Sequence, residues 1–188
     1  FVFSVLSWKN EVMQYPKPYT KPDVFGDAGV SLFQSLSGMI NLTGRADISN
    51  NDLIMGVFAG PQGATNLILL SVCAIILIFR RSISVTAFAG LIGTVSFYSV
   101  IYPINDSIWK SLLYMLTGNM LIFGAIYITS DVRTAPKNSV SGLVYGIITG
   151  LMTFYLTKVH KMENAVVFSS LITSPLAMAL DEYMHRFK

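Results

Sequence analysis

The sequence has few charged residues and a single cysteine. Of its 188 residues, 12% are charged and 53% are hydrophobic, and its mean hydropathy is +0.57. Charged residues make up about 25% of an ordinary soluble domain, so this composition excludes a disordered chain, a coiled coil and most soluble enzymes. The lone Cys73 cannot build a disulfide framework or a cysteine-based metal or iron–sulfur site within this chain.

Long uncharged runs divide residues 53–188. Five of them contain 17 residues or more: 53–79, 82–105, 111–130, 138–157 and 164–180. A transmembrane helix needs roughly 20 apolar residues, with about 17 as a minimum, whereas strands of a membrane barrel are shorter and alternate apolar with polar residues. The sequence therefore predicts an all-α integral membrane fold, with about five transmembrane helices in contact with the lipid bilayer.

Lysine and arginine are unevenly divided between the two predicted membrane faces. One face carries Arg80, Arg81, Arg133, Lys137, Arg186 and Lys188, and the short loops of the other carry Lys110, Lys158 and Lys161. Cytoplasmic loops of membrane proteins are enriched in these residues, so the first face, with the C-terminus, is predicted to be cytoplasmic. The net charge of +3 reflects this bias, and no basic patch indicates nucleic-acid binding.

The two histidines do not suggest a metal site. His160 and His185 stand 25 residues apart and fall near opposite faces of the predicted membrane fold. Ligands on opposite faces cannot share one ion, so neither a metal nor a haem site is expected.

Residues 1–52 differ in character from the rest. Residues 1–8 are apolar, too short to span a membrane and without a starting methionine, so we expect the end of a helix whose beginning is missing, in a fragment or a processed chain. Three prolines make residues 16–22 an extended segment. The apolar spacing in residues 30–40 fits either a surface amphipathic helix or a packed external loop.

Three glycines follow one another at a spacing of four in the fourth uncharged run. Gly142, Gly146 and Gly150 share one face of the predicted helix, and small residues at this period let another backbone approach closely. The pattern is typical of helix packing. The alternative is a face that admits the flat ring of a cofactor.

The loop after the third run combines an acid, hydroxyl groups and basic residues. Asp131 and Thr134 lie in residues 129–138 (TSDVRTAPKN) at a predicted helix end, where unpaired backbone groups can take an ion or a polar ligand. A tight turn capped by Asp131 or Thr134 is the alternative. An earlier interruption, residues 60–66 (GPQGATN), is predicted to open the first spanning helix, with Thr65 or Asn66 near its N-cap.

Five segments together point to a known family. In chain order they are residues 1–8 (FVFSVLSW), 60–66 (GPQGATN), 130–136 (SDVRTAP), Glu163 and 180–183 (LDEY). Along nearly its whole length the chain resembles the C-terminal half of the RnfD/NqrB family. The family's hydroxyl-rich loop usually reads threonine, aspartate, proline, valine, threonine, a small residue and proline. Ser130, Asp131, Thr134 and Pro136 keep that pattern, while Val132 replaces its first proline.

The resemblance implies a role in a respiratory membrane complex. Members are subunits of Rnf complexes and of Na⁺-translocating NADH:quinone reductases, which couple electron flow from ferredoxin or NADH to sodium or proton pumping. They have about twice as many helices as this chain. The resemblance thus implies a multi-pass protein of the bacterial inner membrane, with other membrane subunits as partners.

The family's covalent flavin site is altered in this chain. Members attach FMN to the threonine of a Ser/Thr-Gly-Ala-Thr motif in the external loop, but aligning residues 29–31 with its start puts Gln34, which has no hydroxyl, at the threonine. Residues 63–65 spell Gly-Ala-Thr, yet Gln62 precedes them and the segment better matches another stretch of the family, with Ala64 replacing a glutamate. Thr65 is the remaining candidate, and covalent attachment is not expected.

Two functional hypotheses follow from the resemblance. In the first, the chain holds a noncovalent flavin (FMN or riboflavin) or a quinone, with the ring against Gly142, Gly146 and Gly150 and polar contacts from Asp131 and Thr134. In the second, it is a redox-inactive scaffold or permeation subunit of a larger envelope complex. The altered flavin motif favours the second hypothesis, and the retained loop favours the first.

Overall fold

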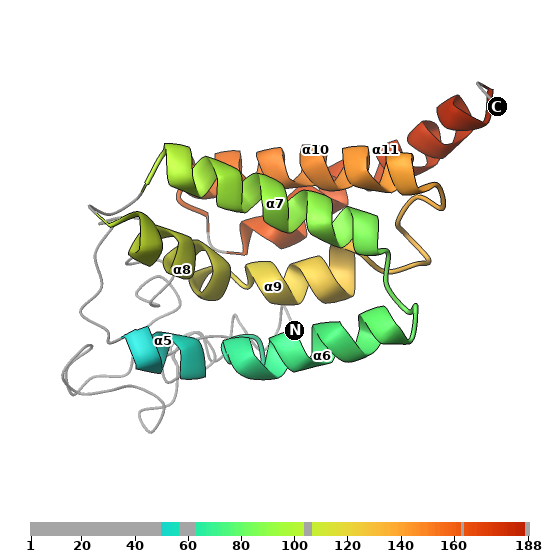
Figure 1. Ribbon diagram of the computed structural model, residues 1–188. Helices are drawn as coiled ribbons and strands as arrows, with labels where there is room; N and C mark the ends of the chain where they lie inside the picture. Colours follow the sequence, from blue (N-terminus) through green and yellow to red (C-terminus); the bar gives the residue numbers. More distant parts are fainter. Residues whose placement is uncertain (1–49, 57–62, 104–106, 163, 187–188) are drawn as a thin grey trace, which may run out of the picture.

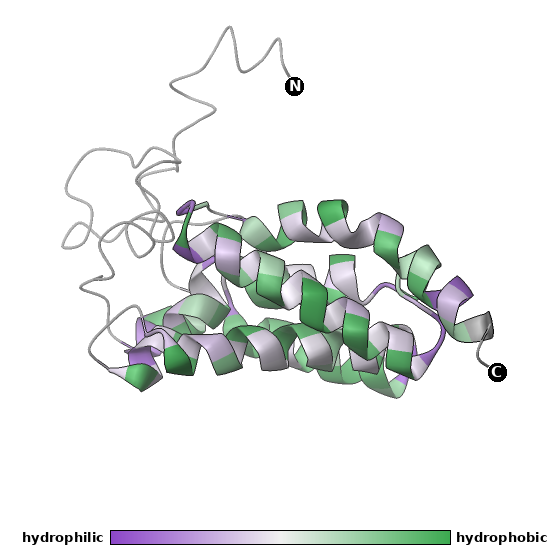
Figure 2. Ribbon diagram, turned by 90° about the horizontal axis from the view of Figure 1, so that it is seen from above, coloured by the Kyte–Doolittle hydropathy of each residue, from purple (hydrophilic) through white to green (hydrophobic). Residues whose placement is uncertain are grey.

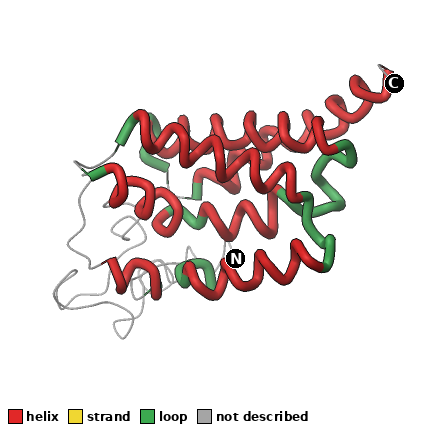
Figure 3. The backbone as a smooth tube through the Cα atoms, viewed as in Figure 1, coloured by secondary structure: helices red, strands yellow, loops and turns green. Residues whose placement is uncertain are grey.

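The structure, a computed structural model, describes residues 50–56, 63–103, 107–162 and 164–186. Its elements are α5 (Asn50–Met55), α6 (Leu67–Phe79), α7 (Val85–Ile101), α8 (Ile108–Gly118), α9 (Leu121–Gly124), the π-helix η3 (Ala125–Thr129), α10 (Ser139–Lys158) and α11 (Ala165–Arg186). Within these residues no strand forms, and the one bridge joins Ile83 to Asp131 (Figure 3). The all-α prediction is confirmed for this part of the chain.

The helices lie side by side along one common direction (Figure 1). α7, α10 and α11 pack together, α8 and α9 lie beneath them, and α5 and α6 form the far edge. The α6–α7 turn, the η3–α10 loop and the C-terminal end of α11 gather at one end of this bundle. The end of α7 and the α10–α11 loop lie at the other. The basic loops that the sequence assigned to a common face therefore share one end, while which end faces the cytoplasm stays a prediction.

The outside of this bundle differs from the surface of a water-soluble protein, and its apolar core also contains buried hydroxyl groups. Large apolar side chains are exposed on the outside, among them Leu171 at 73% and Leu69 at 56%. Hydroxyl side chains such as Thr149 and Thr173 are buried inside. Figure 2 shows apolar residues distributed over the helices rather than confined to an inner face. An apolar exterior around a partly polar interior fits a protein surrounded by lipid.

In the part of the chain that the structure describes, two helices are long and apolar enough to cross a membrane, residues 139–159 and 165–184. A third span requires that α8 and the α9–η3 segment, bent by 56° at their junction, count as one. α6 and α7 are apolar but shorter, with 13 and 17 residues, or about 20 and 26 Å at 1.5 Å per residue, against a hydrocarbon core of about 30 Å. The predicted number of about five spans is not confirmed, because uncharged runs include loop and turn residues.

The bend between α8 and α9 has a backbone cause. Met120, at the start of α9, has a φ of 53°, in the left-handed region. A non-glycine residue in this conformation interrupts the α-helical hydrogen-bond pattern. The buried Asn119 next to it is 2% exposed, so the break lies inside the bundle.

Asn66 is the N-cap of α6. It is one of the two residues that the sequence predicted near this position. Its side-chain Oδ1 accepts a hydrogen bond from the amide of Leu69 at 2.9 Å, which satisfies an otherwise unpaired group of the first turn. The predicted features of residues 1–49, including the truncated helix, the extended proline segment and the amphipathic segment, lie outside the described residues.

We expect Asn66→Ala to lower the stability of the folded protein by about 1 kcal/mol, the usual cost of losing an N-cap. Asn66→Ser keeps an acceptor and should recover most of this loss. Thermal unfolding of the two variants in the intact detergent-solubilised complex measures the difference. Equal melting temperatures for both would show that the cap contributes nothing.

Candidate functional site

The glycine face of α10 packs directly against α7. A Cβ added at Gly146 would collide with the carbonyl oxygen of Ala87, and one at Gly150 would lie 3.0 Å from the carbonyl oxygen of Leu91. From the α7 side, a Cβ at Gly90 would lie 2.7 Å from the carbonyl oxygen of Leu143. The helix-packing interpretation of the glycines therefore describes the structure, and a flat ring on this face would have to displace α7.

Gly142 belongs to the same contact, one turn nearer the start of α10. A Cβ there would lie 2.5 Å from the hydroxyl oxygen of Thr86. The contact continues beyond the glycines, where the rings of Tyr98 and Phe154 lie 5.4 Å apart. Since both partners advance by four residues in the same direction, α7 and α10 run parallel in one fixed register.

The loop after η3 is a hydrogen-bonded turn that begins with Ser130. The Ser130 hydroxyl donates to the carbonyl oxygens of Ala125 and Ile126 at 2.6 and 2.9 Å. Its own carbonyl accepts from the amide of Ser84 at 2.8 Å, which joins this loop to the α6–α7 turn. Asp131 Oδ1 accepts from the amide of Arg133 at 3.1 Å. The alternative of a turn capped by Asp131 is thus confirmed.

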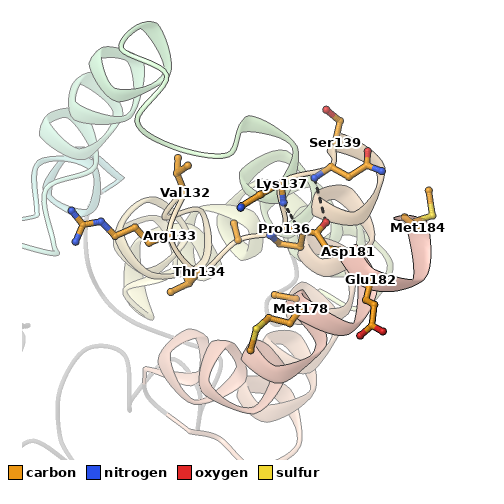
Figure 4. A pocket seen from close by; sticks show the side chains of 13 residues that line it. Val132, Arg133, Thr134, Pro136, Lys137, Ser139, Met178, Asp181, Glu182 and Met184 are labelled. Carbon is orange, nitrogen blue, oxygen red and sulfur yellow. Dashed lines mark hydrogen bonds between the residues drawn. The ribbon is translucent and has the colours of Figure 1, made fainter. Parts of the chain in front are cut away.

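Thr134 lines an open cavity of about 950 Å³ between this loop and the end of α11. The cavity is lined by Val132, Arg133, Thr134, Ala135, Pro136, Lys137, Asn138, Ser139, Ala177, Met178, Asp181, Glu182 and Met184. In Figure 4, Met178 extends from α11 on the side of Thr134, whereas Glu182 points away from the loop and Arg133 extends away from that helix. The Thr134 hydroxyl makes long contacts of 3.4 and 3.3 Å to the carbonyl oxygens of Ile128 and Asp131.

Asp181 joins the two sides of this cavity. Its carboxylate accepts hydrogen bonds from the amides of Lys137 at 2.7 Å and Asn138 at 3.3 Å, just before α10 begins (Figure 4). These amides would otherwise be unpaired at a helix N-terminus, where a negative charge is favourable. A role for Asp181 was not predictable from local sequence, because its partners are 44 and 43 residues away. Two signals were available: an acid near the end of an apolar helix, and its place in the closing segment 180–183 that carries the family resemblance.

Thr65 lies far from this cavity. It is half-buried in the turn before α6, where its backbone packs closely against Gly56. The start of α6 and the η3–α10 loop lie at opposite ends of the bundle (Figure 1). The structure therefore brings Thr134 and Asp181 to one cavity, places Asp131 in the adjoining turn, and leaves Thr65 apart.

The sequence of the chain is similar to a family of known proteins. A family model described as the NQR2, RnfD, RnfE family matches residues 1–188. The chain belongs to this family. A curated relative is a subunit of the ion-translocating oxidoreductase complex of Rhodobacter capsulatus, 25% identical over 131 residues, which are 69% of this chain and 34% of that protein. The NQR2/RnfD chain thus spans about a third of the length of this relative.

Two of the segments that carry the family resemblance lie close together in the structure. The retained loop, residues 130–136, and the closing segment, residues 180–183, lie far apart in the sequence. In the folded chain both segments line the cavity, and Asp181 bonds to the amides of Lys137 and Asn138, which directly follow the first segment. The cavity is therefore the candidate functional site.

Proposed function

We propose that the chain is part of a membrane subunit of an ion-translocating electron-transport complex of the Rnf/Nqr type. The match of the family model to all 188 residues carries this proposal, and the apolar helices of spanning length support it. Other membrane subunits are its partners, and the bacterial inner membrane is its location. The end of the bundle that holds the candidate site faces the cytoplasm, since most of the loop lysines and arginines belong there.

Within that complex, the cavity beside residues 130–138 holds a noncovalent flavin, FMN or riboflavin, or a quinone. Its volume of about 950 Å³ falls in the range of small-molecule sites, about 300–1,000 Å³. Apolar groups of Val132 and Met178 can cover a ring, while Thr134 and Asn138 offer hydrogen bonds to its polar edge. A bound cofactor supplies the electron transfer, and these residues bind and orient it.

Noncovalent binding is proposed because both candidate attachment motifs are altered. Gln34 replaces the threonine of the first, and Gln62 replaces the hydroxyl residue that should open the second. The start of α6, which Thr65 precedes, also lies away from the η3–α10 loop (Figure 1).

Cofactor analysis of the purified complex tests this proposal. We expect a flavin or quinone that is released on denaturation, seen by absorption and fluorescence for a flavin and by mass spectrometry for a quinone, and that photo-crosslinks to this chain rather than to a partner subunit. A flavin peptide containing Thr65 would overturn noncovalent binding. A catalytically active complex with no cofactor on this chain would overturn the carrier role altogether.

A redox-inactive scaffold or permeation subunit is the second candidate. The close packing of α7 against Gly90, Gly146 and Gly150 favours it, because no ring fits between these helices as they are arranged. In this case the complex turns over normally while this chain carries no cofactor, and deleting the chain abolishes assembly or ion transport.

A further inference from the structure

Five hydroxyl side chains are buried in a row between α10 and α11. Thr149, Thr153 and Thr157 lie every fourth residue on α10, and Ser169 and Thr173 lie four apart on α11. Each is at most 3% exposed. Because the two helices run antiparallel, Thr149 pairs with Thr173 at 2.9 Å and Thr153 pairs with Ser169 at 2.5 Å.

The third hydroxyl on α10, that of Thr157, has no hydroxyl partner on the described part of α11. Thr157 is 1% exposed, and its hydroxyl oxygen has no hydrogen-bond partner among the described residues. Continuing the pairing by four residues on each helix places Ala165, which has no hydroxyl, opposite Thr157. A buried polar group without a partner costs free energy and calls for an explanation.

Three hydroxyls on one helix and two on the other allow two pairings. If α11 moves by one turn, about 5.4 Å, toward the Lys158 end of α10, Thr153 pairs with Thr173 and Thr157 pairs with Ser169. Two hydroxyl pairs exist in either register, and the side chain left over changes from Thr157 to Thr149. One-turn movements of packed elements are a known form of switching between two discrete arrangements.

The packing of α10 against α7, on the face opposite to α11, indicates that α11 is the helix that would move. There the glycines hold α10 against α7 with backbone atoms in contact, so these two helices act as one body. α11 meets α10 through the paired hydroxyl side chains and through apolar groups, with Ala177 in one buried cluster with Tyr145 and Val166 in another with Phe154. Six residues, numbers 159–164, separate the end of α10 from the start of α11, and chain reach alone permits a movement of one turn, since an extended chain reaches about 3.3 Å per residue.

We propose that α11 slides by one helical turn along α10, and that Asp181 holds the register seen here. Its carboxylate accepts from the amides of Lys137 and Asn138, and the shifted register would take it one turn deeper, level with Tyr145. A carboxylate moved toward the membrane interior is costly unless it is neutralised. The sliding helix would therefore carry a proton or a monovalent cation with Asp181. This last step rests on the proposed role in ion translocation, whereas the sliding itself does not.

Cysteine crosslinking in native membranes, in a Cys73→Ser background, tests the sliding. The pair Thr153→Cys with Ser169→Cys reports the register seen here, and Thr157→Cys with Ser169→Cys reports the shifted one. The matched control, Thr149→Cys with Ser169→Cys, is displaced by one turn in the opposite direction. We expect the first two pairs to form disulfides under mild oxidation and the control pair to remain reduced.

Removing the negative charge of Asp181 should increase the population of the shifted register of α11. Adding Asp181→Asn should raise the crosslinking rate of the shifted pair on the order of tenfold relative to the first pair, the effect of losing a charge-assisted hydrogen bond. Crosslinking of the first pair alone, with or without Asp181→Asn, would overturn the proposal. Equal crosslinking of the shifted and control pairs would also overturn it, by showing unspecific mobility. Because no readout depends on a cofactor, failure here is separate from failure of the proposed cofactor site.

Discussion

Gly90→Ala is expected to break the contact between α7 and α10 and to prevent accumulation of the folded complex. The added Cβ would lie 2.7 Å from the carbonyl oxygen of Leu143 and 3.2 Å from the backbone of Gly146 and of Ile147. All of these are backbone atoms of one helix and cannot move out of the way separately. Overpacking of this kind costs about 1–3 kcal/mol, which is a large part of the stability of a typical domain.

Gly93→Ala is the matched control on the same helix. No atom of the described residues lies within 4 Å of a Cβ at Gly93, so this variant should be neutral or gain up to about 1 kcal/mol from helix propensity. Fluorescence-detected size-exclusion chromatography with a heating step compares both variants in the full protein. If Gly90→Ala and Gly93→Ala behave alike, the α7–α10 contact is not as close as the structure shows.

Local chemistry made part of this fold predictable from the sequence. Asn66 was expected near the start of the first apolar helix, because its side chain can accept from a free amide of the first turn. The spacing of Gly142, Gly146 and Gly150 indicated close packing of helices, and the helix that packs there is α7. In each case a short stretch of chain contains the whole physical cause.

Features set by the packing of distant segments were not predictable. The break at Met120 comes from one left-handed residue inside an uncharged run that reads as a single helix. The pairing of Thr149 with Thr173 and the bonds of Asp181 to the start of α10 depend on how α11 returns along α10. Hydropathy places each of these helices in the membrane but does not say which faces meet.

Met178→Trp is expected to lower the amount of noncovalent cofactor that copurifies with the complex to less than about half of the wild-type amount. Met178 lines the cavity from α11 and is 79% exposed, so a larger side chain can enter the open space without disturbing the core. An indole replaces the linear thioether chain of methionine by two fused rings, and a site that must bury most of a ligand's surface loses affinity when part of its volume is filled.

Leu171→Trp is the control for the general effect of an added indole on this helix. Leu171 is 73% exposed on α11 and does not line the cavity, so an indole at this position has room and fills no part of the cavity. Cofactor released per mole of purified complex, together with the yield of assembled complex, separates loss of binding from loss of folding. An unchanged cofactor content in Met178→Trp would place the cofactor elsewhere and favour a scaffold or permeation role. An equal decrease in both variants would assign the effect to assembly, in contradiction to a binding site at this cavity.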